Sequence, residues 1–158
     1  MILKRAKTFS RDIKSLITIH ADLTYLAVSI PHGEDYEYEH IISKKRVLDF
    51  DPNASRVELS SLGNGMLLPK SENNKKKDKT LYEYGDPEQY NDLIEASDYP
   101  TKETMDHVFD SLSVSDFSAV NIQIRQRSKR IAHVIVDNLG LKFLVLMMIN
   151  ARDSRLFF

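Results

Sequence analysis

The amino-acid sequence predicts an α+β domain that is mainly helical, because helical periodicity dominates the chain and only two short segments carry the pattern of strands. The chain has 158 residues, which is about the size of one domain. Its 42% apolar composition is enough for a hydrophobic core of its own. We therefore expect residues 1–158 to form a single domain.

The first predicted elements are a helix over residues 11–30 and a strand over residues 36–42. Ser10 can cap the helix, and Pro31-His32-Gly33 would stop it. Its apolar residues recur at intervals of three and four: Ile13, Leu16, Ile17, Leu23, Leu26, Ala27 and Ile30. The strand is predicted from aromatic and β-branched residues that alternate with glutamates.

A long loop, a second strand and a lysine-rich helix are predicted next. Residues 44–63 contain a proline and three serines but little periodicity, which is typical of a loop. Met66-Leu67-Leu68 predicts a short strand that ends at Pro69. The five lysines among residues 70–79 would lie at the start of a short helix that runs to a glycine stop at Gly85.

Three more helices are predicted in the second half of the chain. Two cover residues 87–96 and 103–112, and a longer one begins at a Ser115 cap and ends at Asn138-Leu139-Gly140. The long helix has one apolar face, which consists of Phe117, Val120, Ile124, Ile131, Val134 and Ile135. Residues 141–158 are apolar enough to pack against the domain.

Composition narrows the classes of function. The chain has 22 Lys and Arg against 23 Asp and Glu, so its net charge is −1 and a polyanion would have to bind a local basic patch. It has no cysteine, which excludes disulfides, thiol catalysis and cysteine-ligated zinc and is consistent with a reducing compartment. The basic start is not followed by a signal-peptide core, and the longest apolar run, residues 143–149, is far shorter than the roughly 20 residues of a membrane span. We expect a cytoplasmic protein without a membrane partner.

Several polar residues combine into one recognisable pattern. The sequence Glu39-His40-Ile41-Ile42 is followed by Leu62-Gly63-Asn64-Gly65-Met66-Leu67-Leu68-Pro69, with Asn73 nine residues after Asn64 and Lys76 three residues further. The pattern resembles the ββα-metal motif of the HNH nucleases. It is most similar to the HNH domain at the C-terminal end of GmrSD-type, modification-dependent restriction proteins.

The resemblance extends over roughly residues 34–136. In the last predicted helix, Ile124, Arg127 and Ile131 resemble the family's recurring Ile-x-x-Arg-x-x-x-Leu pattern. Two positions depart from the family: Ser43 stands where proline is frequent, and Gly65 replaces the usual leucine after the middle asparagine. Neither departure affects a group that would react.

The resemblance implies both a fold and a function. It implies a ββα-metal (His-Me finger) core over about residues 34–85, with flanking helices at about 11–30 and 87–140. It implies a metal-dependent endonuclease that hydrolyses DNA in restriction or anti-phage defence, with a separate nucleotide-using domain or subunit for regulation. It also implies that the amide of Asn64 pins the long loop to the strand and so fixes the catalytic histidine.

The residue types also suit this chemistry on physical grounds. Phosphodiester hydrolysis needs an activated water and a Lewis acid on the phosphate. His40 is the candidate general base, since the ordinary pKa of histidine lets it accept a proton near neutral pH. Glu39 and Asn73 offer hard oxygen donors that suit Mg²⁺ or Mn²⁺. Because neighbouring strand residues point to opposite faces, Glu39 and His40 can share a site only where the strand ends or bulges.

Two basic clusters are candidates for binding nucleic acid. Residues 70–79 have a net charge of +3, and we expect Lys75 and Lys76 to contact backbone phosphates there. The last helix contributes Arg125, Arg127, Lys129 and Arg130. Arg127 lies nearest the apolar face, so it is expected either to contact nucleic acid or to brace the site from beneath.

Plainer interpretations exist for the same residues. His40 could be an ordinary surface histidine, and Asn64 could be a turn residue with positive φ. Asn73 could be a helix cap, and Asn74 could replace it as the metal ligand. The tyrosines could be core residues or could stack on bases; they are Tyr36, Tyr38, Tyr82 and Tyr84. At the level of function, the alternatives are a non-catalytic nucleic-acid-binding or assembly module on the same scaffold, and an RNA-cleaving nuclease.

Overall fold

The computed structural model describes residues 8–26, 35–52, 54–84 and 87–140. It confirms an α+β fold, because two antiparallel strands are combined with helices that make up most of the described chain. In chain order the elements are α1 (Arg11–Thr24), β1 (Tyr36–His40), α3 (Lys44–Leu48), η1 (Leu62–Asn64), β2 (Gly65–Pro69), α4 (Lys70–Lys76), η2 (Pro87–Tyr90), α5 (Asn91–Ala96), α6 (Lys102–Ser113) and α7 (Phe117–Asn138).

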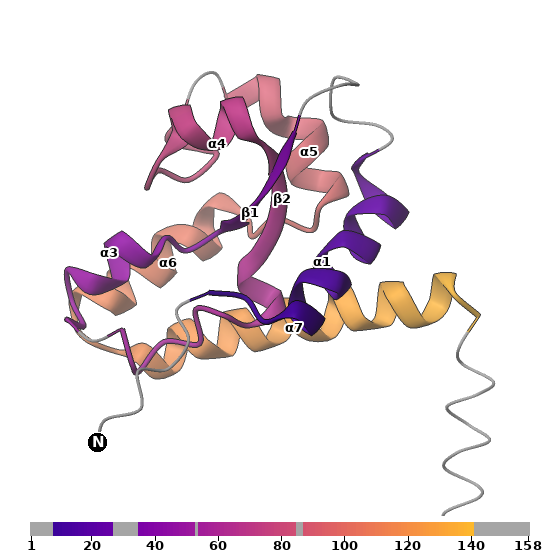
Figure 1. Cartoon of the computed structure of the whole chain (residues 1–158). Coiled ribbons are helices and arrows are strands. Elements are labelled where there is room, and N and C mark those ends of the chain that lie inside the picture. Colours follow the sequence, from indigo (N-terminus) through magenta and orange to yellow (C-terminus); the bar gives the residue numbers. More distant parts are fainter. Residues whose placement is uncertain (1–7, 27–34, 53, 85–86, 141–158) are drawn as a thin grey trace, which may run out of the picture.

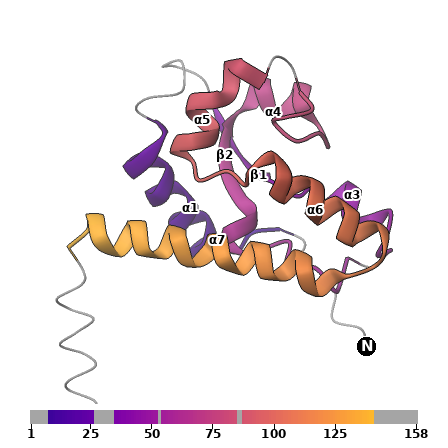
Figure 2. The ribbon, with the colours of Figure 1, turned by 180° about the vertical axis from the view of Figure 1, so that it is seen from behind.

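The two strands lie at the centre of the molecule with the helices around them (Figure 1). α1 lies on one side of the strands and α3 and α6 lie on the other, in both views of the ribbon (Figures 1 and 2). α4 and α5 lie at one end, and the long α7 runs along the opposite end (Figures 1 and 2). α1 contacts β2 and α7, and α4 contacts both strands, so helices hold the small sheet in place.

β1 and β2 pair antiparallel, and their register determines which residues meet. Tyr36 lies opposite Pro69 at one end of the pair, and His40 lies opposite Gly65 at the other. α4 begins directly after β2 and packs on both strands. The last residue of β1 therefore lies beside the first residue of β2, next to Asn64 in the turn before it.

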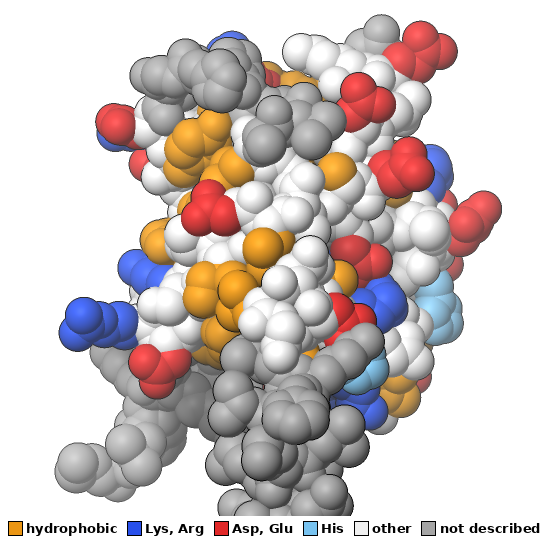
Figure 3. All heavy atoms as spheres, turned by 90° about the vertical axis from the view of Figure 1, so that its right-hand side faces the viewer, with side chains coloured by type: hydrophobic (Ala, Val, Ile, Leu, Met, Phe, Trp, Pro, Cys, Tyr) orange, Lys and Arg blue, Asp and Glu red, His pale blue; other side chains and the backbone are white. Residues whose placement is uncertain are grey.

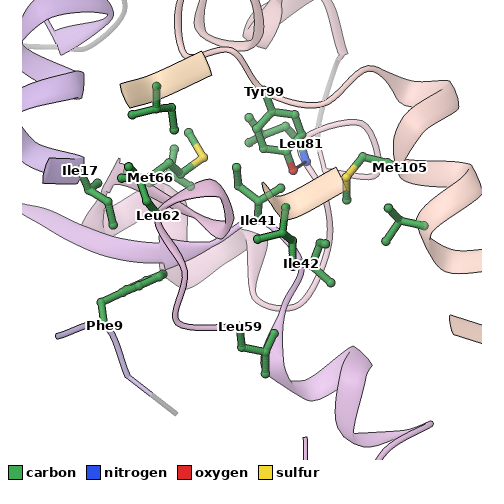
Figure 4. Close-up of a cluster of buried hydrophobic side chains, with 14 of the residues drawn as sticks. Phe9, Ile17, Ile41, Ile42, Leu59, Leu62, Met66, Leu81, Tyr99 and Met105 are labelled. Atoms are coloured by element: carbon green, nitrogen blue, oxygen red, sulfur yellow. Dashed lines mark hydrogen bonds between the residues drawn. The ribbon is translucent and has the colours of Figure 1, made fainter. Parts of the chain in front are cut away.

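The hydrophobic core surrounds β2, all five residues of which are buried. Figure 4 shows Ile17 of α1, Met66 of β2 and Ile41 after β1 as parts of one cluster of buried side chains. A polar contact adds to this packing, since the backbone N–H of Leu67 donates to the hydroxyl of Tyr25 at 2.8 Å. The buried strand gives the site a rigid base.

A close approach between η1 and α7 requires glycine at position 63. A Cβ atom added to Gly63 would lie only 1.9 Å from the backbone carbonyl oxygen of Ile124. The Gly63 N–H also donates to the hydroxyl of Ser128 at 2.8 Å. This contact fixes the segment that contains Asn64 against the longest helix.

Some predicted boundaries in the first half differ from the structure. α1 covers the first part of the predicted helix 11–30, while its predicted stop lies in residues 27–34, outside the described residues. β1 ends at His40 rather than at residue 42, because the chain bends at Ile41 and Ile42 before α3 begins at Lys44. The predicted loop 44–63 was wrong at both ends, which form α3 and η1.

The lysine-rich helix is shorter than predicted. α4 ends at Lys76 because Lys77 has a φ of 57°, in the left-handed region that helices cannot continue through. The predicted stop at Gly85 lies outside the described residues. The lysines thus occupy the whole helix and the turn after it, instead of only a helix start.

The later helices follow the predictions more closely. The segment over residues 87–96 divides into η2 and α5, and α6 matches the predicted helix 103–112 within one residue at each end. The cap of α7 is Asp116, which accepts from Ala119 N–H at 3.1 Å, and not the predicted Ser115. Gly140 has a φ of 65° directly after the helix, which confirms the predicted stop. Residues 141–158 lie outside the described residues.

None of the helices in the described ranges combines the length and the hydropathy that a bilayer-crossing helix needs. The two longest, α1 and α7, instead have one face in the core and one in solvent.

The buried His20 makes stability depend on pH. Burial, and next the positive charge of Arg127, lower the pKa of His20 to about 4. The folded protein therefore holds the neutral ring, whereas the unfolded chain takes up a proton below pH 6.5, so stability falls as the pH drops from 6.5 toward 4. We expect His20 alone to account for about 3 kcal/mol of this loss.

Urea denaturation between pH 7 and pH 4 measures the effect. His20→Gln should lose less stability over this interval than the wild type, because the amide does not titrate. An equal pH slope in the two proteins would contradict this assignment.

Candidate active site

His40 is the last residue of β1, and its ring lies at the edge of the core. The ring stacks on Phe9, with centroids 4.2 Å apart and planes 17° from parallel. Its Nε2 atom is buried and has no hydrogen-bond partner in the described part of the chain. A buried polar atom without a partner costs about 1–3 kcal/mol, and such atoms are rare enough to suggest a functional reason.

The electrostatic surroundings keep His40 neutral. Burial is the largest influence, and the charges of Lys44 and Lys76 act in the same direction, so the pKa of His40 is lowered to about 4. At neutral pH the ring therefore has one nitrogen able to accept a proton. An anion that bound near Lys44 would offset part of this positive field and raise the proton affinity of the ring.

Asn64 clamps the backbone that follows His40. Its side-chain Oδ1 accepts from Ile42 N–H at 2.8 Å, and its Nδ2 donates to the carbonyl oxygens of Ile42 at 3.2 Å and Leu59 at 3.0 Å. Its backbone carbonyl accepts from Ile41 N–H at 2.9 Å. Asn64 is completely buried and does not have the positive φ of the turn interpretation. These bonds join the long connection to the end of β1.

Asn64→Asp should destabilise the fold strongly. The carboxylate would keep the acceptor for Ile42 N–H but would put oxygen against the carbonyls of Ile42 and Leu59, where the amide now donates. We expect a loss of about 3 kcal/mol in the free energy of unfolding, measured by urea denaturation. The matched control is Asn138→Asp at the exposed end of α7, which should change stability by less than about 0.5 kcal/mol. Equal losses in both variants would contradict the clamp.

Two glutamates of β1 face α4. Since residues two apart on a strand share a face, Glu37 and Glu39 both point toward this helix. The amide Nδ2 of Asn73 donates to Glu37 Oε2 at 3.0 Å, and the ammonium of Lys76 donates to Glu39 Oε1 at 2.7 Å. Asn73 lies within α4, so the capping interpretation is wrong.

The contact of Asn73 adds Glu37 to the predicted metal-binding set. Glu37 also lines the cavity that His40 lines. It therefore borders both the side of β1 that faces α4 and the side on which the histidine lies. An acidic residue occupies every second position before His40, and this repeat was the sequence signal for Glu37. The repeat was used to predict the strand but not to predict a metal ligand. Glu39 and His40 themselves occupy opposite sides of the strand end.

The predicted phosphate contact of Lys76 is contradicted by its burial. Its side chain is only 2% exposed and donates to the carbonyl oxygens of Lys77 at 3.3 Å and Lys79 at 2.8 Å besides Glu39. The left-handed turn at Lys77 folds these carbonyls back over the ammonium. Burial raises the pKa of Glu39, and the neighbouring Lys76 charge opposes that rise. Lys76 thus holds the acidic strand against α4.

Arg127 is also buried, which contradicts contact with nucleic acid and supports the bracing alternative. Its guanidinium donates to the backbone carbonyl oxygens of Gly63 at 3.1 Å and Gly65 at 3.0 Å on one side. On the other side it donates to Ser97 at 2.8 Å and Asp98 at 2.7 Å. Burial lowers the pKa of Arg127 to about 10, so it stays charged at neutral pH. Arg127 holds the residues on both sides of Asn64 from beneath.

Three of the other basic residues in the two predicted clusters form ion pairs. Arg125 binds Glu58, Arg130 binds Asp98 at 2.9 Å, and Lys75 contacts Glu72 at 3.3 Å. On the face seen in Figure 3, acidic and basic side chains are interspersed among apolar ones across the described residues. Lys75 has a side chain that is 63% exposed, so of the three predicted nucleic-acid contacts it alone has the access that a phosphate needs.

The donor set near β1 fits a hard divalent cation. The described ranges contain no cluster of three or more His, Cys, Asp or Glu side chains able to hold a metal. Mg²⁺ does not require such a cluster, since it binds through one or two carboxylates, water and substrate phosphate. Glu37, Glu39 and the side-chain carbonyl of Asn73 offer oxygen donors of this kind, and Glu39 already pairs with the Lys76 ammonium.

Comparison with known proteins provides no family. No family model matches the chain, and neither a curated protein nor a solved structure is significantly similar to it. The function of the chain is therefore inferred from the geometry of the site and from the motif in the sequence.

Proposed function

We propose that the chain is a metal-dependent HNH endonuclease that hydrolyses DNA phosphodiester bonds. The observation that carries the proposal is the buried His40 Nε2 without a hydrogen-bond partner among the described residues, at the end of a strand that Asn64 clamps. The strand, its antiparallel partner and α4 follow the order that the ββα-metal motif requires. α4 brings Asn73 to the acidic face of β1.

The residues suggest a division of roles in the reaction. His40 would take a proton from a water molecule, whose oxygen then attacks phosphorus while the bond to the 3′ oxygen breaks, leaving a 5′ phosphate. Mg²⁺ or Mn²⁺ held by Glu39 and Asn73, with Glu37 beside them, would supply Lewis-acid polarisation of the phosphate. Asn64 would hold His40 at a constant position through Ile42, and Arg127 would support that segment from below.

Further parts of the proposal come from the resemblance to GmrSD-type proteins. They are a cytoplasmic role in restriction or anti-phage defence and a separate nucleotide-using domain or subunit that regulates cleavage. Lys75 would contribute an exposed positive charge toward a DNA phosphate.

A second candidate function is a non-catalytic module that binds nucleic acid on the same scaffold. The ion pair between Glu39 and Lys76 favours it, because one predicted metal ligand already has a cationic partner. The two candidate functions differ in what they require of Glu39. Only the nuclease needs the Glu39 carboxylate to bind a metal ion in addition to, or instead of, the Lys76 ammonium.

Plasmid cleavage distinguishes the candidates. The protein is incubated with supercoiled DNA in Mg²⁺, in Mn²⁺ and in EDTA, and a structured RNA is treated in parallel. The nuclease proposal predicts metal-dependent nicking or linearisation of DNA that EDTA abolishes. DNA binding without cleavage in any metal would favour the module, and cleavage of RNA alone would replace DNA as the substrate.

A further inference from the structure

A cavity of about 310 Å³ lies beside His40, on the side of β1 that faces α1. Its lining includes three aromatic rings and three polar side chains: Phe9, Tyr36, Tyr38, Lys14, Glu37 and His40. Its size is at the lower end of the range for small-ligand sites. The lining combines flat apolar surfaces with a positive charge at one border.

Tyr38 is the most exposed of the three aromatic rings of Phe9, Tyr36 and Tyr38 that line this cavity. It is 36% exposed. Its position is nevertheless fixed, since its hydroxyl bonds to the hydroxyl of Thr18 at 3.0 Å and the ammonium of Lys14 lies 5.0 Å from its ring centroid. A fixed, accessible ring loses little conformational entropy when a flat ligand stacks on it.

Two lysines supply positive charge near the cavity, against the single carboxylate of Glu37 in its lining. Lys14 borders the cavity, and the charge of Lys44 acts on the ring of His40. A nucleotide matches both properties, because its base can stack on an aromatic ring while its phosphate meets an ammonium group.

We propose that this cavity binds an unstacked nucleobase of the nucleotide next to the phosphate that the water activated by His40 attacks. The inference rests on the proposed nuclease function and specifies its substrate: single-stranded DNA or duplex DNA with a locally unpaired base. A base inside an intact duplex cannot enter such a cavity, since it is stacked on both faces. Tyr38 provides the stacking surface, and Lys14 contacts the adjoining phosphate.

The test measures binding in EDTA, so that cleavage does not interfere. Fluorescence anisotropy follows the full chain binding to three labelled probes: a single-stranded 12-mer, the same strand with abasic sites in its central positions, and the 12-base-pair duplex. We expect the intact single strand to bind roughly tenfold more tightly than the abasic strand, which has the same charge. It should also bind more tightly than the duplex.

Variants assign the effect to the cavity. Tyr38→Ala should weaken binding of the intact strand about tenfold without changing binding of the abasic strand, and Tyr38→Phe should retain most of the affinity because it keeps the ring. Phe50→Ala is the matched control, since Phe50 is 40% exposed and lies outside the cavity lining. Its binding should stay within twofold of the wild type.

The outcomes separate this inference from the proposed function. Equal affinity of the wild type for intact and abasic strands, or binding of neither, overturns the nucleobase site even if the protein cleaves DNA with Mg²⁺. Base-dependent binding that Tyr38→Ala removes supports the site even if the protein proves unable to cleave. A preference for the duplex over the single strand would also overturn it.

Discussion

His40→Ala is expected to lower the rate of DNA cleavage at least a hundredfold while DNA binding stays within twofold of the wild type. Removing a general base typically costs between about 10² and 10⁴ in rate, whereas the ring contributes no charge to binding because it is neutral at neutral pH. Single-turnover cleavage in Mn²⁺ measures the first quantity, and anisotropy in EDTA measures the second.

Two controls separate a chemical role from a structural one. His107→Ala removes an exposed histidine of α6 and should cleave at the wild-type rate. Added imidazole should restore part of the activity of His40→Ala, because it can enter the space beside Phe9 and accept the proton. Cleavage by His40→Ala at the wild-type rate would exclude His40 as the base, and a loss of folded structure without imidazole rescue would reduce it to a packing residue.

Lys76→Met should destabilise the protein by about 3–5 kcal/mol, although a lysine on a short helix is ordinarily tolerant of change. The substitution removes a buried ammonium and leaves the Glu39 carboxylate without its partner in a poorly hydrated position. The carbonyl oxygens of Lys77 and Lys79 would also lose a donor. Urea denaturation in EDTA measures the loss.

The double variant tests whether the loss comes from the unpaired charge. Adding Glu39→Gln to Lys76→Met should recover a large part of the stability, because a neutral amide is less costly to bury than a carboxylate. Lys75→Met, at the exposed neighbouring position, should change stability by less than about 0.5 kcal/mol. If Lys76→Met proves as stable as Lys75→Met, the ion pair does not hold α4 to the strand.

The strands and the polar motif follow from local patterns in the sequence. Alternation predicted β1 within two residues, and the apolar triplet at Met66 predicted β2, because both patterns report which side chains one face of a strand must bury. Asn64 lies in the turn before β2, and Asn73 lies within α4. Their contacts with Ile42 and Glu37 join parts of the chain that no local pattern connects.

The roles of the charged residues were harder to predict, because burial depends on tertiary packing. A run of lysines normally indicates an exposed face, yet the left-handed conformation of Lys77 encloses Lys76 among carbonyl oxygens. Arg127 lies on the apolar face of α7, which hinted at its burial, but its four backbone acceptors come from two distant segments. Glu37 was not predicted as a site residue, because its place in the site depends on its contact with Asn73 of α4.

The most direct test of one divalent-cation site near His40 is anomalous diffraction from crystals soaked in Mn²⁺. The proposal predicts a single strong anomalous peak bonded to oxygen atoms of Glu39 and Asn73, with Lys76 displaced from Glu39 Oε1 and the His40 ring turned from the opposite side of the strand end to face the ion across the space for a water. Crystals in which Mn²⁺ binds away from these residues, or in which Lys76 keeps Glu39 and no peak forms beside it, would contradict the nuclease proposal.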